Sequence, residues 1–115
     1  EYEKLSDDRL GEDSATIQAR VEAAREHQRV RFNESTGGIL CNADMRPADL
    51  RLYCQLDAAG SALLKTAMQQ LQLSARAYHR VLKLARTIAD LAGEANIQTT
   101  NLAEALQYRP KMDLL

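Results

Sequence analysis

The sequence predicts an all-α fold, a small bundle of about five helices with one long central helix. Three observations lead to this prediction. Residues 74–93 hold a two-sided pattern with the helical period over roughly five turns. Aromatic residues make up only 4% of the chain, so alanine and leucine must fill the interior and let helices pack closely. The length of 115 residues suits one domain with a real core.

The N-terminal part is predicted to contain an arm followed by a helix. Residues 1–12 are acidic and lack periodicity, so we expect a linker or loosely docked arm before a helical domain at 13–115. The first helix should cover about residues 14–30, with Asp13 or Ser14 as its N-cap. Its inward positions at the helical spacing are Ile17, Val21, Ala24 and Gln28.

The middle of the chain is predicted to form a loop and two further helices. Residues 33–42 include a Gly-Gly pair and should be a loop. A short helix should begin near Pro47, because proline is tolerated in a first turn. Asp57 then caps a third helix at about residues 58–70, which Gly60 weakens in its first turn. The inward side chains of both helices should be Leu50, Tyr53, Cys54, Ala58, Ala62, Leu63, Ala67 and Leu71.

The fourth helix carries the clearest pattern of the chain. Ser74 should cap it and Gly93 should end it, because glycine enters the left-handed conformation cheaply. Its predicted apolar face holds Tyr78, Val81, Leu82, Leu84, Ala85, Ile88, Ala89, Leu91 and Ala92. Its predicted polar face holds Arg76, Arg80, Lys83, Arg86 and Asp90. Since the apolar arc is wider than a surface helix needs, this helix should be central, with neighbours on both flanks.

A last helix should follow the central one. The connector after Gly93 has one apolar anchor, Ile97. Thr99 or Thr100 is the predicted N-cap of a helix that runs to about Tyr108, where the following Pro110 stops it.

Composition limits the classes of function. A net charge of −1 argues against an overall nucleic-acid footprint, although it leaves room for a local basic stripe. Cys41 and Cys54 are too few and too far apart for a zinc site or disulfide framework, and reduced thiols in a cytoplasmic protein are favoured. No apolar run reaches membrane-spanning length, so no membrane partner is expected. The first residue is Glu1, and we expect a longer parent protein.

Motifs for catalysis are missing from the sequence. It contains no Gly-rich phosphate loop, no H-E-x-x-H and no C-x-x-C. His27 and His79 have no ligand or nucleophile partner at a recognisable spacing, and His79 should be solvated. We therefore expect no metal site in the chain and no enzyme activity from this fragment alone.

Arg76 is the candidate functional residue. It lies in the first turn of the central helix, where a cation is mildly unfavourable. An anion brought there would meet free backbone N–H groups, the helix dipole and a planar guanidinium together. Spacing alone favours an ordinary solvent-facing arginine. Arg80, Lys83 and Arg86 suit a solvated face, a subunit interface or a nucleic-acid contact, and an i,i+4 pairing of Arg86 with Asp90 favours the solvated face.

Three motifs together resemble one family. They are R-V-x-x-A-R-x-x-Q-x-x-R at residues 20–31 followed by Asn42, L-S-A-R-A-Y-H-R-V-L-K-L-A-R-T-I-A-D-L at 73–91, and A-E-A-L-Q-Y-R at 103–109. In order and spacing they resemble the C-terminal helical domain of magnesium-chelatase-like AAA+ ATPases of the bacterial competence protein ComM / YifB type. The resemblance covers nearly the whole chain.

The resemblance implies that this domain is the lid of an ATPase core. Arg76 matches the family's sensor-2 arginine, a catalytic and cofactor-binding residue that reaches the γ-phosphate of ATP. ATP and Mg²⁺ would be held by an AAA+ core upstream, which makes the parent an ATPase. The implied partners are that core, neighbouring subunits of a ring, and DNA, whose branch points the ComM branch is implicated in moving during natural transformation. The individual roles of Arg20, Arg25 and Arg31 stay unassigned.

Two alternatives of other classes stay open. One is a stand-alone helical nucleic-acid-binding module that uses the face of Arg80, Lys83 and Arg86. The other is a protein-interaction module that self-associates through an exposed apolar face.

Overall fold

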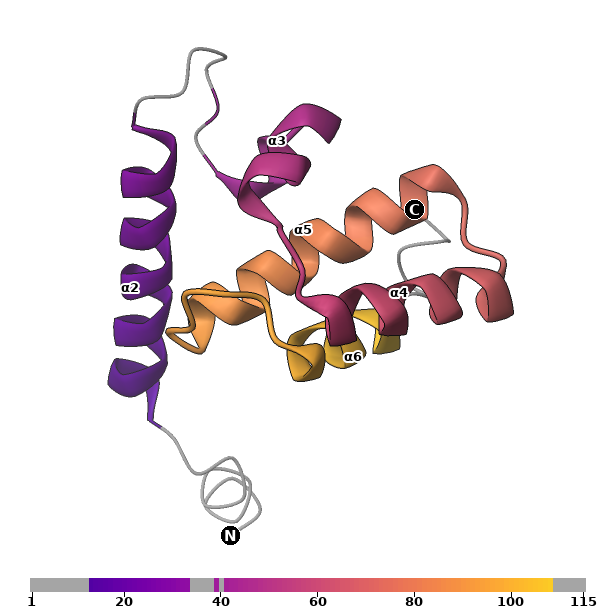
Figure 1. Ribbon diagram of the computed structural model, residues 1–115. Helices are drawn as coiled ribbons and strands as arrows, with labels where there is room; N and C mark the ends of the chain where they lie inside the picture. The colour runs from indigo at the N-terminus through magenta and orange to yellow at the C-terminus, as the bar shows by residue number, and fades with distance from the viewer. Residues whose placement is uncertain (1–12, 34–38, 40, 109–115) are drawn as a thin grey trace, which may run out of the picture.

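The computed structural model of the chain describes residues 13–33, 39 and 41–108. Within these residues it contains five α-helices, one 3-10 helix and no strand (Figure 1). The all-α prediction is confirmed. The predicted arm at 1–12 and the predicted stop at Pro110 lie outside the described residues. The helices are α2 (Ser14–Phe32), η1 (Asn42–Asp44, the 3-10 helix), α3 (Pro47–Tyr53), α4 (Ala58–Leu71), α5 (Ala75–Leu91) and α6 (Thr99–Gln107).

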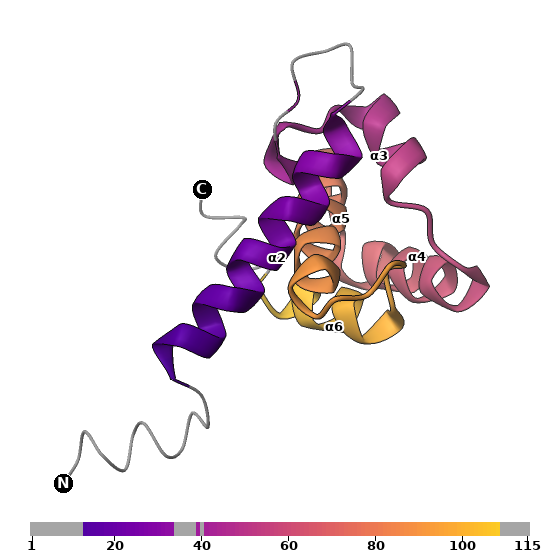
Figure 2. The ribbon, with the colours of Figure 1, turned by 90° about the vertical axis from the view of Figure 1, so that its left-hand side faces the viewer.

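Helix α5 is the centre of the bundle, as the width of its apolar arc predicts. It contacts α2, η1, α3 and α6, while α4 packs against α6. Figure 1 shows α2 standing across the C-terminal end of α5, and Figure 2, turned by 90°, shows α2 crossing in front of it. The two ends of α5 therefore have different surroundings. Helix α2 lies beside its C-terminal half, and its N-terminal end extends away from α2.

Predicted caps begin three of the helices. The side-chain oxygens of Asp13, Asp57 and Ser74 accept hydrogen bonds from the backbone N–H three residues later, at 2.8, 2.7 and 3.1 Å. Gly93 ends α5 with φ +73°, and the N–H of Glu94 donates back to the carbonyl of Ala89 at 2.8 Å. These local predictions are confirmed.

Two helix ends differ from the prediction. Helix α2 continues beyond residue 30 to Phe32, because the Phe32 ring is buried edge-on against Tyr53 with centroids 5.2 Å apart. The N-cap of α6 is Gln98 and not Thr99 or Thr100. The Asn101 side-chain oxygen accepts the Gln98 backbone N–H at 2.7 Å, so the capping side chain lies inside the helix.

The inward face of α4 differs from the prediction. The buried residues are Gly60, Leu64 and Ala67, whereas Ala58, Ala62 and Leu71 are exposed. Gly60 lies close to α6, since a Cβ there would stand 3.2 Å from a methyl of Leu102. The missing side chain lets the helices approach, and this contact turns the Gly60–Leu64–Ala67 face toward α6.

The rest of the core follows the predictions with three exceptions. Leu50, Cys54 and Ile97 are buried and Tyr53 is half-buried. Ile17, Leu91 and Ala92, which were predicted to face inward, are exposed. The buried residues of α2 lie in its second half, at Ala24 and Phe32, so Ile17 falls outside the enclosed part of this helix. Across the described residues, no helix combines the length and the apolar character that crossing a bilayer requires.

Candidate functional site at the two ends of α5

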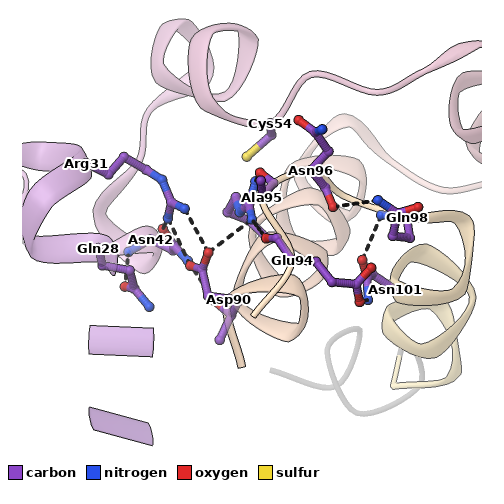
Figure 3. Close-up of polar contacts among 12 residues, drawn as sticks. Gln28, Arg31, Asn42, Cys54, Asp90, Glu94, Ala95, Asn96, Gln98 and Asn101 are labelled. Carbon is purple, nitrogen blue, oxygen red and sulfur yellow. Dashed lines mark hydrogen bonds and ion pairs between the residues drawn. The ribbon is translucent and has the colours of Figure 1, made fainter. Parts of the chain in front are cut away.

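The C-terminal end of α5 carries a buried polar cluster centred on Asp90. The cluster consists of Arg31, Asn42, Arg86 and Asp90, and Figure 3 shows the side chains of Arg31 and Asn42 converging on Asp90. Arg31 donates from Nη2 to Asp90 Oδ1 at 2.7 Å and from Nη1 to Oδ2 at 2.9 Å. Asn42 Nδ2 donates to Oδ2 at 2.9 Å, and Arg86 Nη2 lies 3.1 Å from Oδ1. Each carboxylate oxygen of Asp90 therefore has two partners: Oδ1 contacts Arg31 and Arg86, and Oδ2 contacts Arg31 and Asn42.

Arg86 connects the cluster to the loop between α5 and α6. Its Nη1 donates to the carbonyl of Ala95 at 3.0 Å and its Nη2 to the carbonyl of Glu94 at 2.9 Å. These carbonyls follow the C-terminus of α5, where backbone carbonyls concentrate negative partial charge. The guanidinium thus joins the last turns of α5 to the connector.

Asn42 connects the cluster to η1 and α2. Its side-chain oxygen accepts from Arg31 Nη1 at 3.0 Å, and its Nδ2 also donates to Thr87 Oγ1 at 3.1 Å. Its backbone N–H donates to the side chain of Gln28 at 2.9 Å. The structure thus gives Gln28 and Arg31 of the first motif, and the later Asn42, a common place in one network.

Electrostatics keep Asp90 ionised in this buried setting. Burial by itself raises the pKa of the Asp90 carboxyl. Hydrogen bonds from Arg31 and Asn42, with the positive charges of Arg31 and Arg86, outweigh burial and hold the pKa below its ordinary value. The Asp90 side chain is 1% exposed, and those of Arg31 and Arg86 are 15% and 5% exposed. The cluster therefore holds one carboxylate between two guanidinium groups in a largely buried place.

The prediction that Arg86 and Asp90 belong to a solvated face is wrong. Their i,i+4 ion pair is present, but both residues are buried. The partners that make burial tolerable, Arg31 and the carbonyls after α5, come from distant or irregular segments that a helical pattern does not reveal. The proposed nucleic-acid face of Arg80, Lys83 and Arg86 therefore loses its third member.

A surface groove of about 800 Å³, which we call the basic groove, runs along α5 from Arg76 to Thr87. Arg76 is exposed there, and no described residue forms a hydrogen bond or ion pair with it. Lys83 Nζ donates to the carbonyl of Ala43 at 3.3 Å, which ties η1 to the far end of the groove. The residues lining the groove are Ala43, Arg76, His79, Arg80, Lys83, Leu84 and Thr87.

The basic groove can receive an anion at the start of α5. Ser74 Oγ accepts a hydrogen bond from the backbone N–H of Ala77, and the first turn of α5 contains no acidic residue. His79 is half-buried and packs edge-on to Tyr78. Among residues 13–33, 39 and 41–108, no three His, Cys, Asp or Glu side chains gather as metal ligands would. The groove thus offers positive charge and donors, and Arg76 is more exposed than Arg80.

The two cysteines are free thiols in different surroundings. Cys54 is buried with its sulfur 4.0 Å from the sulfur of Met45, and burial raises the pKa of the Cys54 thiol to about 11. Cys41 is partly exposed, and its Sγ lies 3.5 Å from Asp44 Oδ2.

Comparisons with known proteins define the family. The chain belongs to the family described as magnesium chelatase, subunit ChlI C-terminal, which matches residues 11–109. It is 43% identical over 105 residues to competence protein ComM of Haemophilus influenzae, covering 91% of this chain and 19% of that protein. It is 40% identical over 99 residues to YifB of Escherichia coli, covering 86% of this chain and 18% of that protein.

YifB of Salmonella typhimurium is 38% identical over 99 residues, which cover 86% of this chain and 18% of that protein. The chain thus spans about a fifth of the length of the curated relatives it matches. It is a C-terminal domain of the ComM/YifB type, and the expected family is confirmed.

Proposed function

We propose that this domain is the lid of a magnesium-chelatase-like AAA+ ATPase and that Arg76 is its sensor-2 arginine. In this proposal an upstream core of the parent protein binds ATP and Mg²⁺. The lid closes over the nucleotide and brings Arg76 to the γ-phosphate. The observation that carries the proposal is the exposure of Arg76 in the first turn of α5, with no hydrogen bond or ion pair to a described residue.

The chemistry of Arg76 suits this role. A guanidinium presents several donors in a fixed plane, which matches the oxygens of a phosphate. Positive charge near the transferring phosphoryl group stabilises the charge that develops in the transition state. The free end of α5 adds backbone N–H groups and the helix dipole on the same side. Release of the γ-phosphate removes the contact, so the lid can pivot and pass the motion to neighbouring subunits.

The test is ATP turnover by the full-length protein at saturating ATP. Arg76→Ala should lower kcat by about a hundredfold, the order seen when a charge-stabilising donor is lost. Arg76→Lys should recover only part of the loss, because an ammonium cannot make the planar two-point contact. Arg51→Ala is the matched control, since Arg51 is an exposed arginine on α3. Unchanged turnover by an assembled Arg76→Ala protein removes Arg76 from the mechanism.

We further propose a ring assembly that acts on DNA in a parent of the ComM type. The support is the family resemblance and the similarity to a relative named as a competence protein. Hydrolysis gated by Arg76 would drive DNA branch migration during natural transformation. Full-length protein should move a synthetic four-way junction with ATP, and the Arg76→Ala variant should not. Junction movement that survives the loss of ATP turnover would refute this coupling.

A further inference from the structure

The Asp90 cluster and Arg76 occupy opposite ends of one helix. They are 14 positions apart on α5, which corresponds to about 21 Å along the helix axis. The cluster touches α2 through Arg31, η1 through Asn42 and the α5–α6 connector through Arg86. Among these elements α2 comes first in the chain, so in the proposed function it is the element nearest in sequence to the upstream core.

We propose that the two-point contact between Arg31 and Asp90 sets the direction of α5 relative to α2 and thereby positions Arg76 at the nucleotide. Arg31 and Asp90 are positioning residues here, and neither contacts ATP. This inference rests on the proposed function of Arg76. The family resemblance assigns no role to Arg31. In this inference Arg31 orients α5 and acts at a distance from the reacting phosphate.

The geometry favours positioning over simple stabilisation. Replacing a buried ion pair by apolar residues of the same volume is often neutral or stabilising, so a buried pair is a poor device for stability alone. Two parallel N–H···O bonds, however, fix both the distance and the angle between the helices that carry them. Asn42 and Arg86 also contact the Asp90 carboxylate. These two contacts help to hold the orientation of the carboxylate plane. Because Arg76 lies near the other end of α5, a small rotation of this helix about Asp90 displaces Arg76 by a larger distance.

Arg29 provides a matched control on the same helix. It lies two positions before Arg31, but its guanidinium bonds only to Glu26 in the described structure, and that pair is exposed. Changing Arg29 removes a similar charge from α2 without touching Asp90. Any effect confined to Arg31 is therefore an effect of the contact between α2 and α5.

The test is a double-mutant cycle in the full-length protein, measured as kcat and KM for ATP. Arg31→Gln should lower kcat by about ten- to a hundredfold, the range expected for a small misplacement of a catalytic group, with little change in KM. Arg31→Lys should recover turnover partly, and Arg29→Gln should be neutral. In the Arg76→Ala background, Arg31→Gln should cause no further loss, because the group that it positions is already gone.

The outcomes separate this inference from the proposed function. Losses that multiply in the double variant overturn the positioning role while leaving Arg76 in place. An Arg31→Gln protein that folds and turns over normally also overturns it. If Arg31→Gln is unfolded at the assay temperature, Arg31→Lys carries the same cycle. Full turnover by Arg76→Ala overturns the proposed function itself, and the positioning of Arg76 with it.

Discussion

Arg31 and Asp90 are 59 positions apart in the chain, yet their side chains meet through two hydrogen bonds of 2.7 and 2.9 Å. The contact joins the end of α2 to the last turn of α5 in a site from which water is largely excluded. One carboxylate faces two guanidinium groups there, and Asn42 completes its hydrogen bonding. The stability of the domain should therefore depend on this carboxylate far more than on its exposed acidic residues.

Asp90→Asn should destabilise the domain by about 3 kcal/mol, because it leaves the buried Arg86 and the partly buried Arg31 without their counter-charge. Glu26→Gln is the control, since the Glu26–Arg29 pair is exposed and screened by solvent, and its effect should be far smaller. Urea unfolding of the 115-residue chain measures both. Equal stability of the Asp90→Asn and Glu26→Gln variants would contradict the importance of the buried cluster.

Acid should weaken the domain partly through the same residue. The pKa of Asp90 is lower in the folded chain than in the unfolded chain, so its stabilising contribution is complete above the unfolded value, about 3.9. That contribution is lost as the pH falls through the folded pKa. The stability difference between the wild type and Asp90→Asn should thus shrink when the pH is lowered from 6 toward the folded pKa.

Thermal unfolding of both proteins across this pH range checks the expectation. Asp13, Glu26 and Asp49, whose pKa values are also lowered by hydrogen bonding, are present in both proteins and cancel in the comparison. A difference that stays constant with pH would show that Asp90 does not titrate with unfolding.

The two left-handed residues that flank α5 should respond in opposite ways. Gly93 has φ +73° and Gln72, which ends α4, has φ +52°. A Cβ at Gly93 meets no atom within 4 Å, so Gly93→Ala should cost about 1 kcal/mol through backbone conformation alone. Gln72→Gly should be neutral or stabilising, because it removes the same conformational cost. Urea midpoints measure both, and a destabilised Gln72→Gly protein would contradict the assignment.

The two thiols should react at different rates in the folded chain. Burial raises the pKa of Cys54 to about 11 and shields its sulfur, so little thiolate is available near pH 8. Cys41 is partly exposed and should be alkylated first by iodoacetamide. Mass spectrometry of timed samples should show one modification on the native chain and two in denaturant. Equal labelling of both thiols before unfolding would contradict the packing of α3 against α5.

The sequence predicts helix caps well, because a cap depends on residues that are close together in the chain. Asp13, Asp57 and Ser74 act on backbone groups three positions away, so a local pattern is enough to find such caps. Arg29 and Arg31, by contrast, look alike in the sequence, because both lie in a basic helix with acidic neighbours. Only the fold brings Arg31 to Asp90 and leaves Arg29 with Glu26.

The same limit explains why the helical pattern predicts a solvated place for Asp90 and Arg86, which are buried. Opposite charges at i and i+4 have the same sequence spacing in a solvated pair and in a buried pair, so the spacing does not distinguish them. The role proposed for Arg76 rests on the resemblance of its motif, since spacing alone favours an ordinary surface arginine. The structure adds the exposure of Arg76 and the basic groove around it.

The most direct measurement is a structure of the full-length protein with a non-hydrolysable ATP analogue and Mg²⁺. We expect the Arg76 guanidinium to lie within about 3 Å of a γ-phosphate oxygen, while Arg31 stays bonded to Asp90 at the other end of α5. A nucleotide-bound structure in which Arg76 faces away from the phosphates, while another residue of the chain contacts them, would contradict it.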